Sequence, residues 1–264
     1  MNKIRRQNKL MIIGAIIFLG ALLLWTLGFE LYSRNAEKEE TIDKDIALIT
    51  LHLDNTALYM EETDTENLSY TMTRSRNIEW KMYGKELRIT ARGGILTVNI
   101  PEDMELQSIN IENHKEVSYI YSVDAGELKM NTDGKLILQD IEAERAKLDA
   151  SNLEISSSEL DTLFINATDK IDITETDIDN LSLFFGDLDA TVLGGNIGYV
   201  KASSRSGSLE IEPENGISTI TVTGEVSTIF IDGEDTVSES FVDDGNPDGA
   251  HIEFTSSKGS VKTC

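Results

Sequence analysis

Two hydrophobic patterns divide this chain of 264 residues. Positions 10–29 form an uninterrupted apolar run that contains no charged side chain. As an α-helix this run would span about 30 Å, the thickness of the hydrocarbon core of a bilayer. After the run, apolar and polar residues alternate with a period of two, and helical periodicity is nearly absent. The patterns predict one N-terminal transmembrane helix followed by an all-β portion.

Basic residues lie before the apolar run, and acidic residues dominate after it. Lys3, Arg5, Arg6 and Lys9 precede the run, whereas Glu30 follows it directly. Because positively charged flanks stay on the cytoplasmic side, we expect a single-pass cell-membrane protein with a cytoplasmic N-terminus and an extracytoplasmic C-terminal domain. A cleaved signal peptide is the alternative, but its apolar region is usually only ~7–15 residues long and ends near an A-x-A-like site. We therefore expect an uncleaved signal anchor.

The rest of the chain is predicted to be one β-rich unit on a short stalk. The expected parts are a basic tail at 1–9, the transmembrane helix at 10–29, a polar stalk at 30–45, and a β-repeat domain at 46–264 with leading strands at 46–140, regular repeats at 150–232 and an acidic loop at 233–250. The best helix candidate after the anchor is the segment IEAERAK at 141–147, which we interpret as a short connector.

A repeat begins near residue 150. Four segments share the pattern apolar, two variable, apolar, variable, apolar, and they start at residues 160, 178, 197 and 217. A second element lies between them: Gly186-Asp187-Leu188, Gly207-Ser208-Leu209 and Gly224-Glu225-Val226. Two short strands in each period of about 19 residues are typical of a stack of coils. The repeat predicts a β-solenoid, similar to a parallel β-helix, and a meandering β-sandwich is the alternative.

The order of these elements carries a family resemblance. A strand at Gly84-Lys85-Glu86-Leu87-Arg88-Ile89 is followed by an apolar strand that ends at Pro101, then by the tandem Gly-Asp-Leu-like repeats. The tail is Ser256-Ser257-Lys258-Gly259-Ser260-Val261. Over residues 46–262 the chain resembles the bacterial "putative adhesin" family of β-strand-repeat domains, of the membrane-anchored, Gram-positive cell-envelope type. The resemblance implies a role in envelope stress or its sensing, and it brings no catalytic residue with it.

Composition narrows the possible partners. The chain carries 47 acidic against 23 basic residues, a formal net charge of −24, which argues against nucleic-acid binding because phosphate recognition needs clustered Lys and Arg. A single cysteine, Cys264, excludes internal disulfides and multi-cysteine metal sites, and the three histidines are scattered. The remaining partners are other envelope proteins or cationic peptides, and no cofactor is expected.

The candidate chemistry of the repeats has a structural explanation in each case. Acidic pairs recur at Asp169/Asp172, Asp177/Asp179, Asp187/Asp189 and Asp243/Asp244. They could hold Ca²⁺ or act as the acid and base of glycoside cleavage. We expect instead that they occupy outward positions of the coils and are exposed to solvent. Four serines, Ser203, Ser204, Ser206 and Ser208, have no histidine nearby and are typical of a turn. Exposed aromatics could stack on sugars or contact a partner, but aromatics at alternate strand positions usually belong to the core, and we expect this of Trp80, Tyr70, Tyr83, Tyr119 and Tyr121. We assign no catalytic, cofactor-binding or metal-binding residue.

Two functions of different classes fit the sequence. The first is a non-enzymatic, membrane-anchored surface protein whose β-repeat domain binds, adheres or senses envelope stress. The second is a surface enzyme of the β-helix type that acts on polysaccharides. Convergent catalytic residues would separate the two, and the sequence shows none, so we expect the first.

Overall fold

The computed structural model describes residues 38–42, 45–74, 77–187, 189–223, 229–231, 234–236, 240–242, 246–256 and 260–263. These residues are all-β, as predicted, and they form one sheet system of 18 strands. Among them there is no helix long and apolar enough to cross a membrane. The predicted anchor at 10–29, the basic tail and the first part of the stalk lie outside the described residues.

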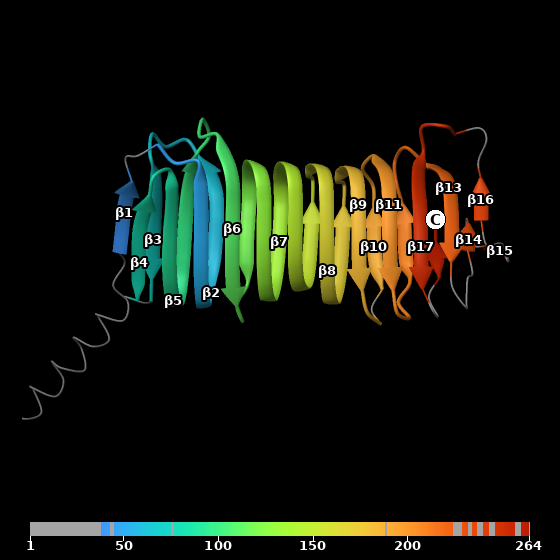
Figure 1. Ribbon diagram of the computed structural model, residues 1–264, viewed down its shortest axis with the longest axis horizontal. Helices are drawn as coiled ribbons and strands as arrows, with labels where there is room; N and C mark the ends of the chain where they lie inside the picture. The colour runs from blue at the N-terminus through green and yellow to red at the C-terminus, as the bar shows by residue number, and fades with distance from the viewer. Residues whose placement is uncertain are drawn as a thin grey trace, which may run out of the picture.

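In the described part of the chain, only turns, bends and short connections separate one strand from the next. Their bounds are β1 Lys38–Ile42, β2 Leu48–Thr63, β3 Leu68–Thr73, β4 Ile78–Tyr83, β5 Glu86–Pro101, β6 Leu106–His114, β7 Ser118–Ser156, β8 Glu159–Thr174, β9 Asp177–Phe185, β10 Ala190–Leu193, β11 Ile197–Ser204, β12 Leu209–Glu212, β13 Ile217–Thr223, β14 Ile229–Ile231, β15 Glu234–Thr236, β16 Ser240–Val242, β17 Ala250–Ser256 and β18 Val261–Lys262. Strands as long as β7 wind around the long axis of the molecule rather than running straight (Figure 1).

The central part of the molecule is a stack of parallel strands in two faces. On the first face, the first half of β8 pairs with β9, and β9 pairs with β11. On the second face, the second half of β8 pairs with β10, and β10 pairs with β12. One strand of each face makes up what we call a coil. Each strand residue is therefore paired with the residue at the equivalent position of the next coil. Leu163 pairs with Leu181, and Leu181 pairs with Val200.

The repeat starts earlier than the sequence suggested. The same apolar pattern begins at Leu106, Ala125, Ala143, Leu160, Ile178 and Ile197, which are all buried. The predicted helix at 141–147 is therefore wrong, because these residues are part of β7 and pair with β8. Ala143 and Ala146 point inward and Glu142 and Glu144 point outward, and hydrogen bonding to the neighbouring strand overrides the local helix propensity of Ala, Glu and Lys.

The register of the second repeated element also differs from the prediction. The sequence pattern aligned residue 188 with Leu209, whereas the structure pairs Ala190 with Leu209 and places Gly186 and Asp187 at the bend before β10. A shift by two positions keeps every side chain on the same face, so the hydrophobic pattern could not distinguish the two registers.

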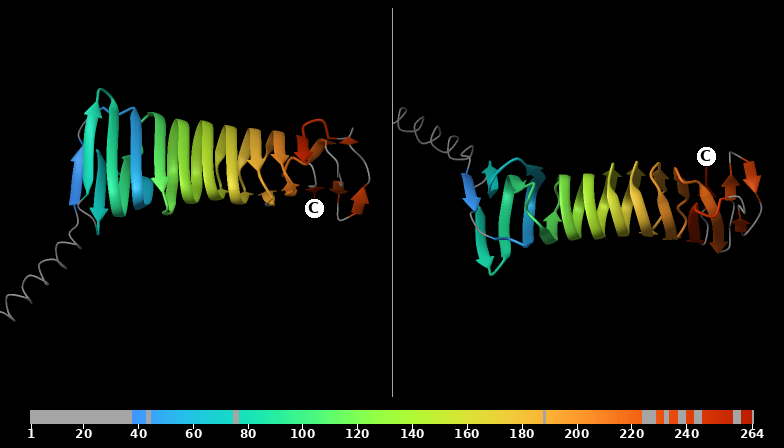
Figure 2. Two further views of the ribbon diagram at one scale, coloured as in Figure 1. Left: turned by 60° about the horizontal axis from the view of Figure 1, so that its bottom comes forward. Right: turned by 90° about the horizontal axis from the view of Figure 1, so that it is seen from above.

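At the N-terminal end the chain doubles back (Figure 2). β2 lies between β5 on one side and β6 and β7 on the other, and all of these pairs are parallel. The outer side of β5 is covered by the antiparallel strands β3 and β4, and β1 adds to β3. Part of the predicted stalk at 30–45 is therefore strand, because residues 38–42 form β1.

At the C-terminal end the last strands are inserted into the stack. β17 lies between β11 and β13, and β18 lies between β12 and β14, all in parallel register. The segment that starts at residue 217 therefore does not follow the segment at 197 directly but lies one layer further out. The hydroxyl group of Tyr199 on β11 hydrogen-bonds the carboxylate of Glu253 on β17, which raises the pKa of Tyr199.

An asparagine supports the step from one layer to the next. The side chain of Asn215 accepts a hydrogen bond from the backbone N–H of Ile197 at 3.1 Å and donates to its carbonyl oxygen at 2.9 Å. The same amide donates to the carbonyl of Asp248, just before β17, at 3.0 Å. Asn215 thus replaces the backbone partner that Ile197 would have in a regular stack, so the amide and carbonyl groups of Ile197 are both paired there.

A single carboxylate ties the N-terminal strands together. Glu40 on β1 accepts a hydrogen bond from the hydroxyl of Tyr70 at 2.8 Å and another from the indole Nε1 of Trp80, and it forms an ion pair with Lys38 at 2.8 Å. These partners, Lys38 first and Tyr70 second, hold the pKa of Glu40 below its ordinary value. The pKa of Tyr70 is raised, first by burial and then by the hydrogen bond to Glu40.

The inward register can be tested at two adjacent residues. Leu181 is fully buried between Leu163 and Val200, whereas Ser182 lies on the outer side. Leu181→Asp should lower the free energy of unfolding by more than about 3 kcal/mol because it buries an unpaired charge, and Ser182→Asp should cost less than about 1 kcal/mol. Denaturant unfolding measures both, and similar losses at the two positions would reject the register.

The Glu40 contacts predict a pH-dependent stability. Because the folded pKa of Glu40 lies below the unfolded value of about 4.3, its stabilisation is present above that pH and is lost as the pH falls through the folded pKa. Glu40→Gln should therefore lower the melting temperature at pH 7, and the difference from the wild type should shrink toward pH 3. Glu39→Gln, at the exposed neighbouring position, is the control for thermal unfolding by circular dichroism. A difference that is constant from pH 7 to pH 3 would contradict this role.

Candidate functional site

The bends that connect the second face to the first form one edge of the stack. Residues with positive φ recur there once in each successive coil, at Ser122, Asp140, Ser157, Glu175 and Gly194. Only the last is glycine, although a left-handed backbone is costly for other residues. The same conformation recurs at the same point of successive coils, so the geometry of this edge repeats along the stack.

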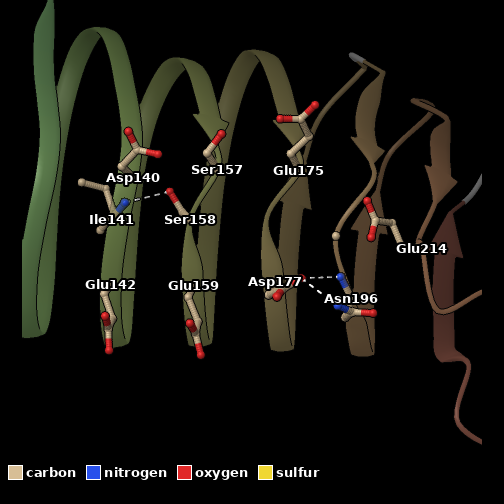
Figure 3. Close-up of a pocket in the computed structure, with 11 residues that line it drawn as sticks. Asp140, Ile141, Glu142, Ser157, Ser158, Glu159, Glu175, Asp177, Asn196 and Glu214 are labelled. Atoms are coloured by element: carbon tan, nitrogen blue, oxygen red, sulfur yellow. Dashed lines mark hydrogen bonds between the residues drawn. The ribbon is translucent and has the colours of Figure 1, made fainter.

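An acidic groove of about 520 Å³ runs along this edge. Figure 3 shows two rows of side chains in it: Asp140, Ser157 and Glu175 in one row, and Glu142, Glu159, Asp177 and Asn196 in the other. The second row begins the first-face strands, where Glu142 pairs with Glu159 and Glu159 pairs with Asp177. Neighbouring strands lie about 4.8 Å apart, so three carboxylates are stacked at the spacing of the backbone ladder.

These three carboxylates have no cationic partner among the described residues. The ion pairs of the described part involve none of them. Asp177 accepts hydrogen bonds from the backbone N–H of Asn196 at 2.6 Å and from its side-chain amide at 3.1 Å. Adjacent carboxylates without a cationic partner give this edge a negative potential and repel one another.

The negative surface continues beyond the first groove. A second groove of about 310 Å³ shares Glu142 and Glu159 with it and is also lined by Glu105, Asp124, Glu144 and Asp161. We call the residues of both grooves the acidic edge. Figure 3 shows the carboxylates of the first groove in two rows, Asp140 and Glu175 in one and Glu142, Glu159 and Asp177 in the other. The acidic edge can attract a cation or a cationic chain.

The aspartates of the acidic pairs noted in the sequence make different contacts in the structure. Asp177 belongs to the acidic edge, whereas Asp172 forms an ion pair with Lys170 at 2.8 Å. Asp187 and Asp189 accept hydrogen bonds from the Ser206 hydroxyl and the Ser208 backbone N–H. Asp243 and Asp244 lie outside the described residues, and the described residues hold no group of three or more His, Cys, Asp or Glu side chains placed to bind a metal ion.

Most of the acidic edge was missed in the sequence because it is made of residues far apart in the chain. Glu142, Glu159 and Glu175 each have an acidic residue two positions further on, but these short pairs do not show that the residues of successive coils lie side by side. Aligning the chain with the coil period observed in the structure brings them together. That alignment needed the coil that contains residues 141–147, which the sequence had suggested to be helical.

The serine-rich segment lies at a bend, and the serines make structural hydrogen bonds. The hydroxyl of Ser204 donates to the carbonyl of Gly207 at 2.7 Å, and Ser206 binds Asp187. Elsewhere, the hydroxyl of the buried Ser218 lies 3.3 Å from Nδ1 of His251. In the described part of the chain no carboxylate bonds to that imidazole, so the pair lacks the orienting group of a catalytic triad.

The aromatic side chains depart from expectation. Tyr70 is buried and Trp80 is partly buried, as expected, but Tyr83, Tyr119 and Tyr121 are exposed. Tyr119 stacks on Tyr59 of the adjacent strand, with ring centroids 5.1 Å apart and an interplanar angle of 6°. Phe164 and Phe184, which the sequence analysis did not single out, also point outward.

Known proteins resemble this chain in fold. No protein-family model matches it, and no curated protein sequence is significantly similar to it. A crystal structure of a "putative adhesin" from Bacteroides fragilis superposes with a TM-score of 0.55 at 10% identity, over 87% of this chain and 97% of that one. A "putative lipid binding protein" from Parabacteroides distasonis gives a TM-score of 0.54 at 13% identity, over 86% of this chain and 96% of that one.

A third crystal structure agrees with these two. It is a "putative adhesin" from Parabacteroides merdae, with a TM-score of 0.52 at 13% identity, over 88% of this chain and 96% of that one. At these identities the likeness concerns the fold alone. It agrees with the resemblance to adhesin-type β-repeat domains, and the Gram-positive, membrane-anchored type remains a prediction.

Proposed function

We propose that this protein is a membrane-anchored surface scaffold that binds or adheres and does not catalyse. In this proposal residues 10–29 cross the cell membrane with the N-terminus in the cytoplasm. The described strands form a β-solenoid of stacked coils, which holds the acidic edge outside the cell. Another envelope protein or a peptide with a cationic segment binds there.

The stacked carboxylates of Glu142, Glu159 and Asp177 carry this proposal. Bringing like charges together at the strand spacing costs free energy, which a cationic ligand offsets by neutralising several of them at once. An extended chain with Lys or Arg at intervals fits a row of carboxylates on a straight edge. The negative potential of the acidic edge would speed the association of cationic partners and favour them over other partners. Both effects would be larger at low salt than at high salt.

The arrangement of the carboxylates favours binding over glycoside cleavage. A glycosidase holds two carboxyl groups roughly 5–9.5 Å apart on opposite sides of the scissile bond. In the acidic edge the carboxylates recur in rows from coil to coil, so no two of them are set apart from the others as an acid and a base (Figure 3). The names of the adhesin structures with this fold also support a binding role. The alternative is a surface enzyme that acts on polysaccharides.

The binding proposal is tested by neutralising the ladder. The triple variant Glu142→Gln, Glu159→Gln and Asp177→Asn should bind a lysine-rich peptide such as octalysine at least about tenfold more weakly, because it removes the stacked charge. Isothermal titration calorimetry at low and at physiological salt measures the affinity. Incubation with wall glycans, followed by product analysis, tests the enzymatic alternative in parallel.

The matched control removes three carboxylates elsewhere. Glu61→Gln, Asp64→Asn and Glu66→Gln change exposed side chains near the N-terminal strands and alter the net charge equally. This variant should keep its affinity within about threefold. Equal losses in the two triple variants would show a diffuse charge effect rather than a site. Steady glycan turnover that depends on one of the ladder carboxylates would overturn the non-enzymatic assignment.

A further inference from the structure

We propose that the outward-facing rings of Phe164 and Phe184 form a binding site for an uncharged glycan. Both residues lie on the first face, Phe164 five residues after Glu159 and Phe184 seven residues after Asp177, and neither lines the grooves of the acidic edge. Phe164 pairs with Ser182, and Phe184 pairs with Asn166, so the two rings are diagonal neighbours on adjacent strands. The site uses neither the carboxylates of the acidic edge nor the membrane anchor, and it is therefore independent of the cationic partner proposed above.

The two rings are unusually open for their size. Phe164 is 45% exposed and Phe184 is 50% exposed, although the other outward residues around them are polar. Phe185, the next residue, points inward and packs against Phe254 of β17. The core is therefore already filled at this position, and packing alone gives no reason for a second phenylalanine outside.

The rings border two grooves that meet at Phe184 and Asn166. The smaller groove, about 320 Å³, lies between the two rings and has an almost wholly apolar lining. The larger groove, about 930 Å³, lies on the other side of Phe184 and is lined by Thr168, Asp169 and Ser203 among others. Both volumes fall within the range of roughly 300–1,000 Å³ that is usual for ligand sites.

The ring faces distinguish this pair from the exposed tyrosines. Tyr59 and Tyr119 stack on each other, so each ring already has an aromatic partner on one face. Among the described residues, neither Phe164 nor Phe184 stacks on another ring or lies under a cation. Flat apolar faces are therefore available, and the C–H face of a pyranose ring packs well on such a surface.

Polar groups beside the rings supply the hydrogen bonds that a sugar needs. Asn166 donates to Asp149 at 2.9 Å, which fixes its amide next to Phe184 and leaves the amide oxygen as an acceptor. The hydroxyl groups of Thr168 and Ser203 and the carboxylate of Asp169 line the adjoining groove. An apolar platform with a few fixed donors and acceptors suits a ligand that alternates C–H faces with hydroxyl groups.

The negative charge around the two grooves favours neutral glycans over anionic ones. The chain has a net charge of −24, and Asp149, Asp169 and Asp187 lie on the borders of these grooves. Lys147 borders the small groove, and Arg205 lies 3.7 Å from Asp187, so the positive charges do not exceed the negative ones. A uronate or phosphate polymer would be repelled, whereas a neutral oligosaccharide loses nothing.

The test uses the full chain in lipid nanodiscs and three defined tetrasaccharides. Chitotetraose and cellotetraose are neutral, and tetragalacturonate is anionic. Saturation-transfer NMR and isothermal titration calorimetry should detect binding of at least one neutral tetrasaccharide and none of the uronate. Phe164→Ala and Phe184→Ala should each weaken that binding at least about tenfold. Absence of binding by both neutral probes would overturn the proposal.

Conservative variants separate ring stacking from general apolar docking. Phe184→Tyr keeps the flat ring and should bind within about threefold of the wild type, whereas Phe184→Leu keeps the apolar surface and should lose binding. Full affinity in Phe184→Leu would contradict the glycan proposal and indicate an apolar peptide site instead. All positions are exposed, and far-UV circular dichroism checks that each variant is folded.

Two controls connect the result to the site. Tyr121→Ala removes a ring that is 45% exposed near the start of β7, beside the bend residue Ser122, and it should leave glycan affinity unchanged. The Glu142→Gln, Glu159→Gln and Asp177→Asn variant should also bind the glycan normally, even where it loses the cationic peptide. A glycan affinity that falls with either control, or that survives both phenylalanine-to-alanine changes, would overturn the assignment.

Discussion

Backbone hydrogen bonding between the equivalent strands of successive coils is the constraint on which the rest of the structure depends. Because each strand of a coil pairs in parallel register with the next, equivalent positions fall into straight columns. Inward columns such as Leu163, Leu181 and Val200 make the core continuous. Outward columns place like side chains together whether or not they attract one another, and the ladder of Glu142, Glu159 and Asp177 is the clearest result. The chemistry of the surface is thus a direct product of the register.

A stack of strands has open edges at its ends, where exposed backbone groups could pair with other molecules. At both ends of the described part, antiparallel strands are added to the parallel stack. β3 and β4 cover β5 at one end, and β16 and β15 pair with β13 and β14 at the other. The inserted strand β17 also joins the end of the chain to β11 and β13, so the C-terminal region stabilises the last coils.

Sequence periodicity correctly predicted the all-β character and the inward aliphatic positions of the repeats, although it misplaced Tyr83, Tyr119 and Tyr121, which are exposed. The periodic signal weakened where small residues fill the interior, and Ala143 and Ala146 were therefore interpreted as part of a helix. Periodicity could not distinguish registers that differ by two positions, nor could it show that β17 separates β11 from β13. At the insertion Asn215 bonds both Ile197 and Asp248, and β17 pairs with strands far away in the sequence, which local patterns do not contain. The acidic edge and the exposed pair of phenylalanines became visible only once the columns were known.

The inserted strand allows a direct test of this stacking. Lys147, Phe164, Ser182, Lys201, Glu253 and Thr221 form one outward column from β7 to β13. In a Cys264→Ser background, spin labels on cysteines that replace Lys147 and Glu253 should be four strand spacings apart, about 19 Å. Labels that replace Lys147 and Thr221 should be five spacings apart, about 24 Å. Pulsed electron paramagnetic resonance measures both distances. The stacking described here predicts that residue 221 is the more distant of the two, and a shorter distance to 221 than to 253 would contradict it.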